Sequence, residues 1–549
     1  MRSRTARTVT YLAIFSGFLV AAGCASVLGF EDTTLRPDVN SEGGPIDDGG
    51  PIDQDGNVLP DGAPSRLTTS PASLVVVRGK TAEITVDVAR GSDVTGTVTA
   101  RLTNLPGGVT ATNAVLNPPA TSGKLTLTAT AKATLGPKTI NLVADGTSLP
   151  PASIPLLVTD APGTLDTTFD ADGFVTDLSK GLGATFFALG RQTDGRIVAA
   201  GAGGPVGGPL AGWIARRFAV NGAPEPAFST ASAALPADGE LHAVAIDANG
   251  KIVCVGSSAP ALLALPQLTI VRLLPTGAID TAFGGGVVRL PAVEAPGGSI
   301  GLGVAIQADG AVVVVGSRRD AGNVEAGVIT RFKANGTRDA AFNGGTTVEI
   351  PLARMVGVSI DASGAVLAAG STTSGALPSY LLTKRTAQGA ADPTFGSAGT
   401  TTFGNTYRAE GFTRLADGSM VVVGGVQQGA AAYTAGATTD KGTTLFAPRA
   451  FAVAVGASYF GVAAQDAKFF IAAGHTAVVN GEARVDRVGV ADGKKDPTFG
   501  AAGTSTIEPG GAANGFDVTL FAAAVQADGR ILVAGNRSNA GAVLYRLWP

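Results

Sequence analysis

The sequence predicts an all-β protein, a seven-bladed β-propeller preceded by a small β-sandwich. One short phrase, a polar pair that is usually Asp-Gly followed by an apolar run closed by Gly, recurs seven times between Gln192 and Gly535. Glycine (77) and proline (31) make up nearly a fifth of the 549 residues, and charged residues only 15%, which is typical of short strands joined by turns. Because a repeat of this kind cannot bury its apolar faces alone, neighbouring copies must pack together.

The polar pair of each phrase predicts a hairpin turn between two strands. Asp-Gly tolerates the positive φ angles that a two-residue loop requires. Five turn glycines lie 54 to 60 residues apart, and these are Gly195, Gly250, Gly310, Gly364 and Gly418. The sixth copy is degenerate at Asp466-Ala467, and the seventh carries Gly529.

Two further elements recur in the repeat, each in six copies. A third strand ends in a basic residue next to an apolar one, at Arg217, Arg272, Arg331, Lys384-Arg385 (shifted), Arg487 and Arg546. An Asp-x-x-Phe phrase, once with Glu in place of Asp, recurs at 166–169, 225–228, 280–283, 339–342, 392–395 and 496–499. We interpret these residues as structural partners between blades, since each occurs once per repeat at one place.

Four strands per unit in sevenfold repetition predict a β-propeller over residues 161–549. The region begins with a strand near 174–178 and ends after a third strand at Leu547, so the N-terminal strand is expected to complete the seventh blade. Residues 430–447 lack both the Arg-apolar and the Asp-x-x-Phe phrases, which leaves the outer strands of blade five open.

These repeats resemble the delta-sixty repeat family, bacterial propellers of largely unknown function that carry a Leu-Asp-x-x-Phe-Gly phrase and an Asp-Gly turn. The resemblance covers residues 161–549. It implies a propeller fold and an exported setting, and it supplies no catalytic residue.

Residues 66–160 predict the small sandwich. Short β-rich runs are separated by turn signals, and Ile84, Val86 and Val88 alternate with polar residues as in a half-buried strand. The segment resembles bacterial immunoglobulin-like domains, and it lacks the core cysteine pair and the tryptophan that their immunoglobulin relatives carry. We expect an antiparallel sandwich that acts as a spacer.

The start of the chain has the layout of an export signal. Arg2, Arg4 and Arg7 precede an uncharged apolar stretch that leads to Cys24. This end resembles a bacterial lipoprotein signal, which implies removal of residues 1–23, acylation of Cys24 and attachment to a membrane. Ala25 after the cysteine resembles the outer-membrane sorting signal of that family in Gram-negative bacteria.

An alternative remains open for the same stretch. Residues 11–30 carry no charge and are long enough to span a membrane as an uncleaved N-terminal helix in the inner membrane. Both alternatives export the rest of the chain. Residues 24–65, rich in Asp, Glu, Gly and Pro, are expected to form a solvated linker.

Composition excludes several functions. A net charge of −3 gives no basic excess for nucleic acid. Two cysteines (Cys24, Cys254) and two histidines (His242, His475) cannot form a metal cluster at recognised spacings, so no metal or cofactor is expected. Cys254 lies in an apolar run and is interpreted as a buried small side chain, and His242 as a structural residue of a strand.

If the propeller has a ligand site, its geometry favours the face that carries the loops between second and third strands and the outer-to-inner connections. The candidate residues on that face are Arg318, Arg319, Arg354, Arg408, Glu410, His475 and Arg537. Their charge suits an anionic ligand or another envelope protein. His475 is expected to begin a loop.

No nucleophile elbow, Walker loop or zinc-protease motif occurs, so the chain is not expected to be an enzyme. The first hypothesis is a monomeric, lipid-anchored propeller at the outer membrane or cell surface that acts as a non-catalytic binding or interaction scaffold. One alternative is a propeller enzyme of the glycan-lyase or lactonase kind, which would use carboxylates and a bound cation. Another is a purely structural envelope component.

Overall fold

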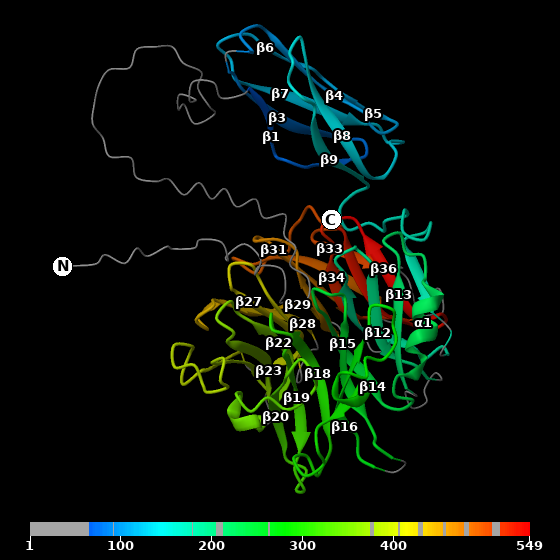
Figure 1. Ribbon diagram of the computed structural model, residues 1–549, viewed down its shortest axis with the longest axis vertical. Helices are drawn as coiled ribbons and strands as arrows, with labels where there is room; N and C mark the ends of the chain where they lie inside the picture. Colours follow the sequence, from blue (N-terminus) through cyan, green and yellow to red (C-terminus); the bar gives the residue numbers. More distant parts are fainter. Residues whose placement is uncertain are drawn as a thin grey trace, which may run out of the picture. The chain divides into compact units, whose positions relative to one another are not determined.

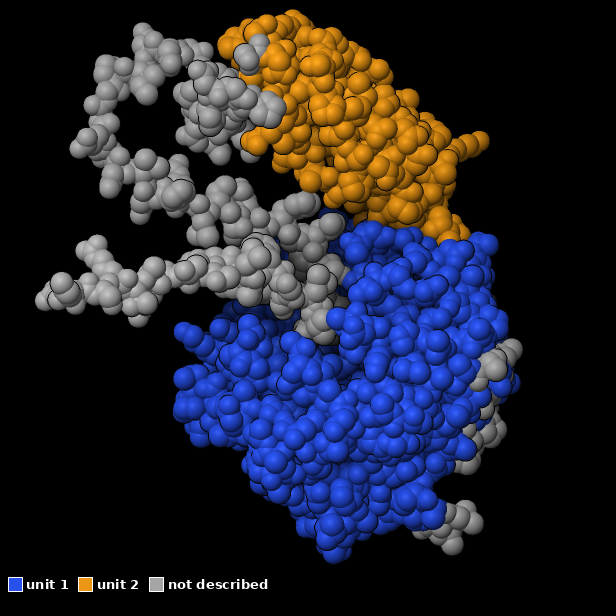
Figure 2. Space-filling view, viewed as in Figure 1, with its two compact units in different colours: residues 1–29, 169–547, 549 blue, residues 30–168, 548 orange. Residues whose placement is uncertain are grey.

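The computed structural model describes residues 65–549, except 92, 178, 180, 205–211, 262–263, 374–377, 405–406, 427–431, 454–456, 477–481 and 508–516. Cys24, the export signal and the linker up to residue 64 therefore lie outside the described residues. The described chain forms two compact units, coloured separately in Figure 2. One contains residues 65–168 and Trp548, and the other residues 169–547 and Pro549. None of the helices in the described part is long and apolar enough to cross a membrane.

The smaller unit contains two sheets. Its strands are β1 (Arg66–Ser70), β2 (Leu74–Val77), β3 (Thr81–Ala89), β4 (Val98–Thr103), β5 (Val109–Ala111), β6 (Ala114–Leu116), β7 (Ser122–Ala129), β8 (Gly136–Asp145) and β9 (Ala152–Thr159). The sheet orders are β1-β3-β7-β5 and β2-β9-β8-β4-β6. Apolar side chains from both sheets share one buried core, which includes Ile84, Leu125, Ile140 and Leu156.

The alternation predicted for β3 is confirmed, because Ile84, Val86 and Val88 are buried and the residues between them are not. The expectation of a wholly antiparallel sandwich is wrong in one place. β2 pairs with β9 in parallel. After β1 the chain crosses to the other sheet, where β2 lies next to β9, the last strand of the smaller unit.

The larger unit consists of seven sheets among the described residues, which we number 1 to 7 by their first strands. The first strands are β11 (Thr185–Arg191), β14 (Glu240–Ile246), β18 (Ser299–Ile306), β22 (Ala353–Ile360), β26 (Tyr407–Arg414), β30 (Ser458–Ala464) and β34 (Val518–Val525). The second strands are β12 (Ile197–Ala202), β15 (Ile252–Ser258), β19 (Val312–Arg319), β23 (Val366–Thr372), β27 (Met420–Val426), β31 (Phe469–His475) and β35 (Ile531–Arg537).

The third strands are β13 (Trp213–Phe218), β16 (Gln267–Leu273), β20 (Glu325–Phe332), β24 (Tyr380–Arg385), β28 (Ala432–Thr438), β32 (Ala483–Gly489) and β36 (Gly541–Leu547). The fourth strands are β17 (Val287–Arg289), β21 (Val348–Pro351), β25 (Thr400–Phe403), β29 (Thr444–Val453), β33 (Thr504–Ile507) and β10 (Phe174–Asp177). All pairings within these sheets are antiparallel.

The first strands form a closed ring. Each contacts the first strand of the next sheet, and β34 of sheet 7 contacts β11 of sheet 1. Figure 1 labels four of these first strands, β14, β18, β22 and β34. Sheet 7 has the order β10-β36-β35-β34, so its outer strand comes from the beginning of the unit and its other three from the end. The two ends of the ring are thus joined by a strand pair.

Sheet 1 differs from the expected four strands, and sheet 5 shows which strands form where the sequence left them open. Sheet 1 has three strands, and the segment after β13 forms the short helices α1 (Pro226–Ala231) and η1 (Ser232–Ala234). Expecting four strands in every unit was therefore wrong for sheet 1. In sheet 5, the segment that sequence left open forms β28 and β29, whose pairing contains several register shifts.

The hairpin turns are tight, but they are not the predicted two-residue loops. In sheet 1 the Gly195 N–H donates to the Gln192 carbonyl, and the Gln192 N–H donates to the Arg196 carbonyl, which encloses three residues. Gly195 has φ +84°, whereas Asp194 is not among the residues with positive φ. The aspartate instead accepts the Arg196 N–H at 3.0 Å through Oδ1. The Asp therefore caps the turn, and the Gly alone supplies the left-handed conformation.

The glycine that closes each phrase is required for a different reason. Every first strand contains one bulge, where its register against the second strand shifts by one residue. A Cβ on the closing glycine would lie 1.8–2.0 Å from a carbonyl oxygen of that strand, in each of Gly201, Gly256, Gly316, Gly370, Gly424, Gly474 and Gly535. Only glycine permits the bulged strand to approach so closely.

Phenylalanines of the Asp-x-x-Phe phrase pack between sheets. Phe169, Phe228, Phe283, Phe342, Phe395 and Phe499 are all buried. Phe228 and Phe342 lie against glycines of the following sheet, where a Cβ on Gly277 or Gly389 would lie 2.9 or 3.3 Å from the phenylalanine ring. In sheet 5, which lacks the phrase, Phe446 of β29 contacts Gly493 in the same way.

Candidate functional site

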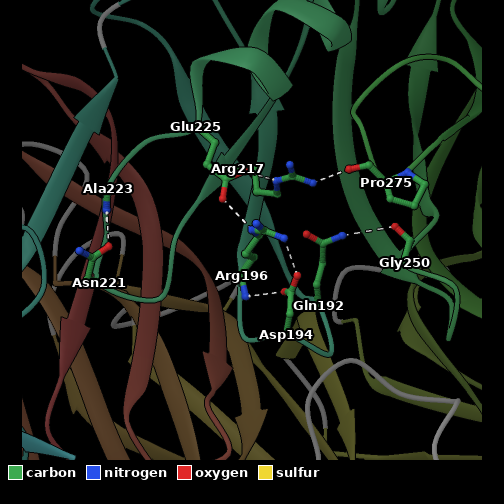
Figure 3. A network of polar contacts seen from close by, with 9 residues as sticks. All are labelled: Gln192, Asp194, Arg196, Arg217, Asn221, Ala223, Glu225, Gly250 and Pro275. Carbon is green, nitrogen blue, oxygen red and sulfur yellow. Dashed lines mark hydrogen bonds and ion pairs between the residues drawn. The ribbon is translucent and has the colours of Figure 1, made fainter.

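The recurring basic and acidic residues lie near the turns between first and second strands. Figure 3 shows the copy in sheet 1, where Glu225 accepts hydrogen bonds from Arg217 Nε and Arg196 Nε, both at 2.7 Å. The Arg217 guanidinium also donates to the Pro275 carbonyl of sheet 2. Gln192 Nε2 donates to the Gly250 carbonyl of the next turn at 3.3 Å.

The same arrangement recurs around the ring. Arg331 Nε donates to Asp339 Oδ2 at 2.7 Å, its Nη1 donates to the Ala387 carbonyl of the next sheet at 2.7 Å, and its guanidinium lies 4.8 Å from the Phe342 ring centroid. Arg272 repeats this set with Asp280, Ala334 and Phe283. In sheets 1, 2 and 3 this arrangement is a clamp that joins the sheet to the next one.

Sheet 7 uses the clamp to close the ring. Arg546 donates to the Val220 carbonyl of sheet 1, and its guanidinium lies 4.6 Å from the Phe169 ring centroid. Sheet 4 departs from the pattern, because Lys384 replaces the arginine and lies 3.3 Å from both Asp361 and Asp392. The repeated charges are therefore occupied by structural contacts, as the sequence interpretation expected.

The residues proposed from sequence lie on the opposite face of the ring. Second strands run antiparallel to first strands. The last residues of the second strands and the first residues of the first strands therefore lie on this face. We call it the ligand face, and define it by the residues Arg318, Arg319, Arg354, Arg408, Glu410, His475 and Arg537. The structure brings only some of them together.

Three of the seven residues form a cluster. Arg354 Nη1 donates to Glu410 Oε2 at 3.4 Å, and Arg408 Nε lies 3.0 Å from Glu410 Oε1. These side chains come from the first strands of sheets 4 and 5. Burial lowers the pKa of Arg354, and repulsion from Arg408 acts in the same direction, while Glu410 and Glu325 oppose it.

The other arginines of the ligand face are engaged separately. Arg318 makes a two-pronged contact with Glu349 of its own sheet, at 2.7 and 2.5 Å. Arg319 Nη1 donates to Asn323 Oδ1 at 2.9 Å. The Arg537 guanidinium lies 5.8 Å from the Phe174 ring centroid in sheet 7.

His475 is the last residue of β31, where it pairs with Ser458 and Ala483, so the expectation that it begins a loop is wrong. The strand extends one residue beyond its closing glycine because β30 and β32 both continue alongside it. Its side chain is buried, and burial lowers the pKa of His475 while Asp517 opposes the shift.

The bulges of the first strands place seven residues at one level of the ring, and sequence reasoning missed five of them, all except His242 and Glu410. The bulged residues are Phe187, His242, Leu302, Val356, Glu410, Phe460 and Phe521. Each lies fourteen residues before the glycine that closes its phrase, as Phe187 does before Gly201 and Phe521 before Gly535. This constant spacing is the signal that could have found them.

Three of the bulged residues, Phe460, Phe521 and Phe187, form an aromatic row that His242 and His475 adjoin. The Phe187 and Phe521 centroids lie 5.0 Å apart, as do those of Phe521 and Phe460, and the His242 ring lies 5.3 Å from Phe187. The His475 ring lies 5.4 Å from Phe460 at the other end. All three phenylalanines are half-buried, unlike the fully buried phenylalanines of the clamps.

His242 also contacts Glu240 of the same strand, with Nε2 3.0 Å from the carboxylate. The hydrogen bond with His242 lowers the pKa of Glu240, although burial opposes the shift. No group of three or more His, Cys, Asp or Glu side chains in the described ranges could hold a metal ion.

Cys254 is fully buried on β15, and burial raises the pKa of its thiol to about 12. The interpretation as a packed small side chain is confirmed.

Comparison with known proteins gives a family match in two segments of the larger unit. The family model described as "Domain of unknown function (DUF5122) beta-propeller" matches residues 307–342 and 526–549. Both segments begin at a hairpin turn and include the second and third strands of sheets 3 and 7. Together with the closed ring of sheets, the match supports a β-propeller family for this chain. No curated protein matches the chain at a significant level.

Similarity to solved structures is weak. A polysaccharide lyase of family PL25, an ulvan lyase, is 9% identical with a TM-score of 0.30, and the match covers 65% of this chain and 90% of that one. Elastase-activated alpha-2-macroglobulin from Escherichia coli is 10% identical with a TM-score of 0.16, covering 79% of this chain and 34% of that one. The trypsin-activated form is 11% identical, with a TM-score of 0.16 and coverage of 88% and 27%.

Proposed function

We propose that this protein is an exported, lipid-anchored, seven-bladed β-propeller that acts as a non-catalytic binding scaffold at the cell envelope. The observation that carries the proposal is that the arginines on the two faces of the ring differ in how far structural contacts occupy them. On the face of the hairpin turns, the repeated arginines are occupied by clamps. On the ligand face, Arg354 and Arg408 share one carboxylate and keep side-chain exposures of 21% and 40%.

The blade count rests on the seven sheets of the larger unit and on the pairing of β10 with β36. The smaller unit, with its own core, fits an immunoglobulin-like spacer between anchor and propeller. Anchoring through Cys24 rests on the sequence of the first 24 residues, where an arginine-rich start precedes an apolar stretch and a small-residue cleavage site.

The anchor has a direct test. We expect mass spectrometry of the protein from its native membrane to find an acylated Cys24 as the first residue. The Cys24→Ala variant should lose the acyl mass and move to the soluble fraction. An intact Met1 would instead support the uncleaved inner-membrane helix.

The scaffold role is tested by capture from envelope extracts with the tagged full-length protein. We expect a component that binds the wild type and is reduced in the Arg318→Ala/Arg319→Ala variant. The control is Lys124→Ala, an exposed residue of the smaller unit that pairs with Glu83. Equal capture by all three proteins would remove the ligand face from the proposal.

A further inference from the structure

The ligand face combines two kinds of surface. One is the aromatic row Phe460–Phe521–Phe187, contributed by the first strands of sheets 6, 7 and 1. Phe187 and Phe521 meet at an interplanar angle of 74°, and Phe460 and Phe521 at 45°, so the row presents ring edges as well as faces. Such a surface favours contact with another apolar ring.

The second surface is the pair Arg354 and Arg408. A guanidinium has five N–H donors, yet within the described chain the 3.4 Å contact with Glu410 is the one hydrogen bond that Arg354 makes. Its side chain is 21% exposed, so the remaining donors are partly shielded from water without being occupied by protein. Burial also lowers its pKa, which means that the charge is less well stabilised than in water.

The two surfaces are neighbours. Glu410 and Phe460 occupy the same bulge position on the adjacent first strands β26 and β30. A Cβ added to Gly411 would lie 2.5 Å from the Phe460 carbonyl oxygen, which shows how closely the two strands approach. Glu410, the partner of Arg354, is thus the bulged residue on the first strand next to that of Phe460.

We propose that the bulged first strands of the ring bind a small organic carboxylate that carries an apolar ring. The carboxylate is received by the unoccupied donors of Arg354, with Arg408 supplying a second positive charge. The ring packs against Phe460 and Phe521. This inference deepens the proposed scaffold function and rests on it, because it names the ligand chemistry of the ligand face.

Isothermal titration of the full-length protein with benzoate, benzamide and acetate tests the proposal. Benzoate should bind at one saturable site, at least tenfold more tightly than benzamide, which lacks the charge, and than acetate, which lacks the ring. Equal binding of acetate would reduce the site to a simple anion contact and overturn the proposal. So would equal binding of benzamide, or no saturable binding of benzoate.

Three variants assign the site. Arg354→Ala and Phe521→Leu should each weaken benzoate at least tenfold without changing the melting temperature, whereas Arg537→Ala on the same face should not. Phe521→Leu keeps an apolar side chain, so that a folding defect is not mistaken for lost binding. Unchanged affinity in Arg354→Ala would overturn the assignment. If benzoate fails while capture of an envelope component still depends on Arg318 and Arg319, only the carboxylate inference falls.

Discussion

At the scale of single residues, the two glycines of the repeated phrase are required for different physical reasons. Turn glycines such as Gly195 adopt a positive φ that other residues avoid. Closing glycines such as Gly316 do not have a positive φ. They are required because a carbonyl oxygen of the bulged strand occupies the place of a Cβ.

The Gly316→Ala variant tests this cause. The added methyl would lie 1.9 Å from the Ile300 carbonyl oxygen, so the bulge must shift, at a cost of about 1–3 kcal/mol as in other overpacked cores. We expect a lower urea midpoint for this variant. Gly322→Ala in the following loop is the control, because its methyl would meet only the Asp320 Oδ1 atom, at 3.2 Å. Equal midpoints for the two variants would contradict the explanation.

At the scale of elements, the Arg-Asp-Phe clamp is what makes neighbouring sheets into one ring. Arg331 contacts Asp339 and Phe342 in its own sheet and the Ala387 carbonyl in the next. Burial raises the pKa of Asp339, but the Ala341 N–H and the Arg331 guanidinium more than offset this effect, so that pKa lies below its usual value. A carboxyl group whose pKa is lowered by folding stabilises the fold only while it is ionised.

This lowered pKa predicts the direction of a pH dependence. The contribution of Asp339 is fully present above the unfolded pKa of about 3.9 and is lost as the pH falls through the lower folded value. Asp339→Asn should therefore lose about 3 kcal/mol at pH 6, since it leaves Arg331 buried without its counter-charge. The loss should shrink at pH 3, as measured by urea unfolding.

Asp309→Asn is the control for this prediction. Asp309 caps the hairpin turn of the same sheet by accepting the Ala311 N–H. A difference between Asp339→Asn and the wild type that stays constant from pH 6 to pH 3 would contradict the ionised clamp.

At the scale of the whole molecule, the ring depends on the pairing of β10 with β36, which joins segments from the two ends of the larger unit. Val175 of β10 is buried in a core that also contains Phe186 near the beginning of the unit and Leu544 near its end. Thr176, the next residue, is exposed.

Val175→Asp should open the ring. Burying an unpaired carboxylate at the closure costs several kcal/mol, so we expect a lower melting temperature and faster proteolysis between sheets 7 and 1. Thr176→Asp places the same charge on the exposed side of β10 and should leave both measurements close to wild type. If the two variants behave alike, the closure does not hold the ring together.

Much of the fold was predictable, because the same sequence pattern recurs seven times. The alternation in β3, the all-β character and the β-propeller class follow from patterns within a few residues of one another. The helical segment after β13 was missed because the Glu225–Phe228 phrase is the same one that precedes strands in other sheets. Phe446 was missed because it comes from a segment without the phrase.

The candidate site was less predictable. Charge alone selected Arg354, Arg408 and Glu410, which do meet, together with Arg318, Arg319 and Arg537, which are engaged elsewhere. The phenylalanines of the aromatic row look like ordinary core residues in the sequence. Their exposure is created by a bulge, which depends on how two strands pair.

By itself, the sequence determined that this protein is built from repeated β units, where each turn lies, and which charges recur in every copy, because these are local and periodic properties. Only the tertiary structure decided which side chains meet across the ring. Phe187 and Phe521 are separated by most of the larger unit along the chain, yet their rings lie 5.0 Å apart. Closure of the ring brings such distant residues together, and no local pattern records that closure.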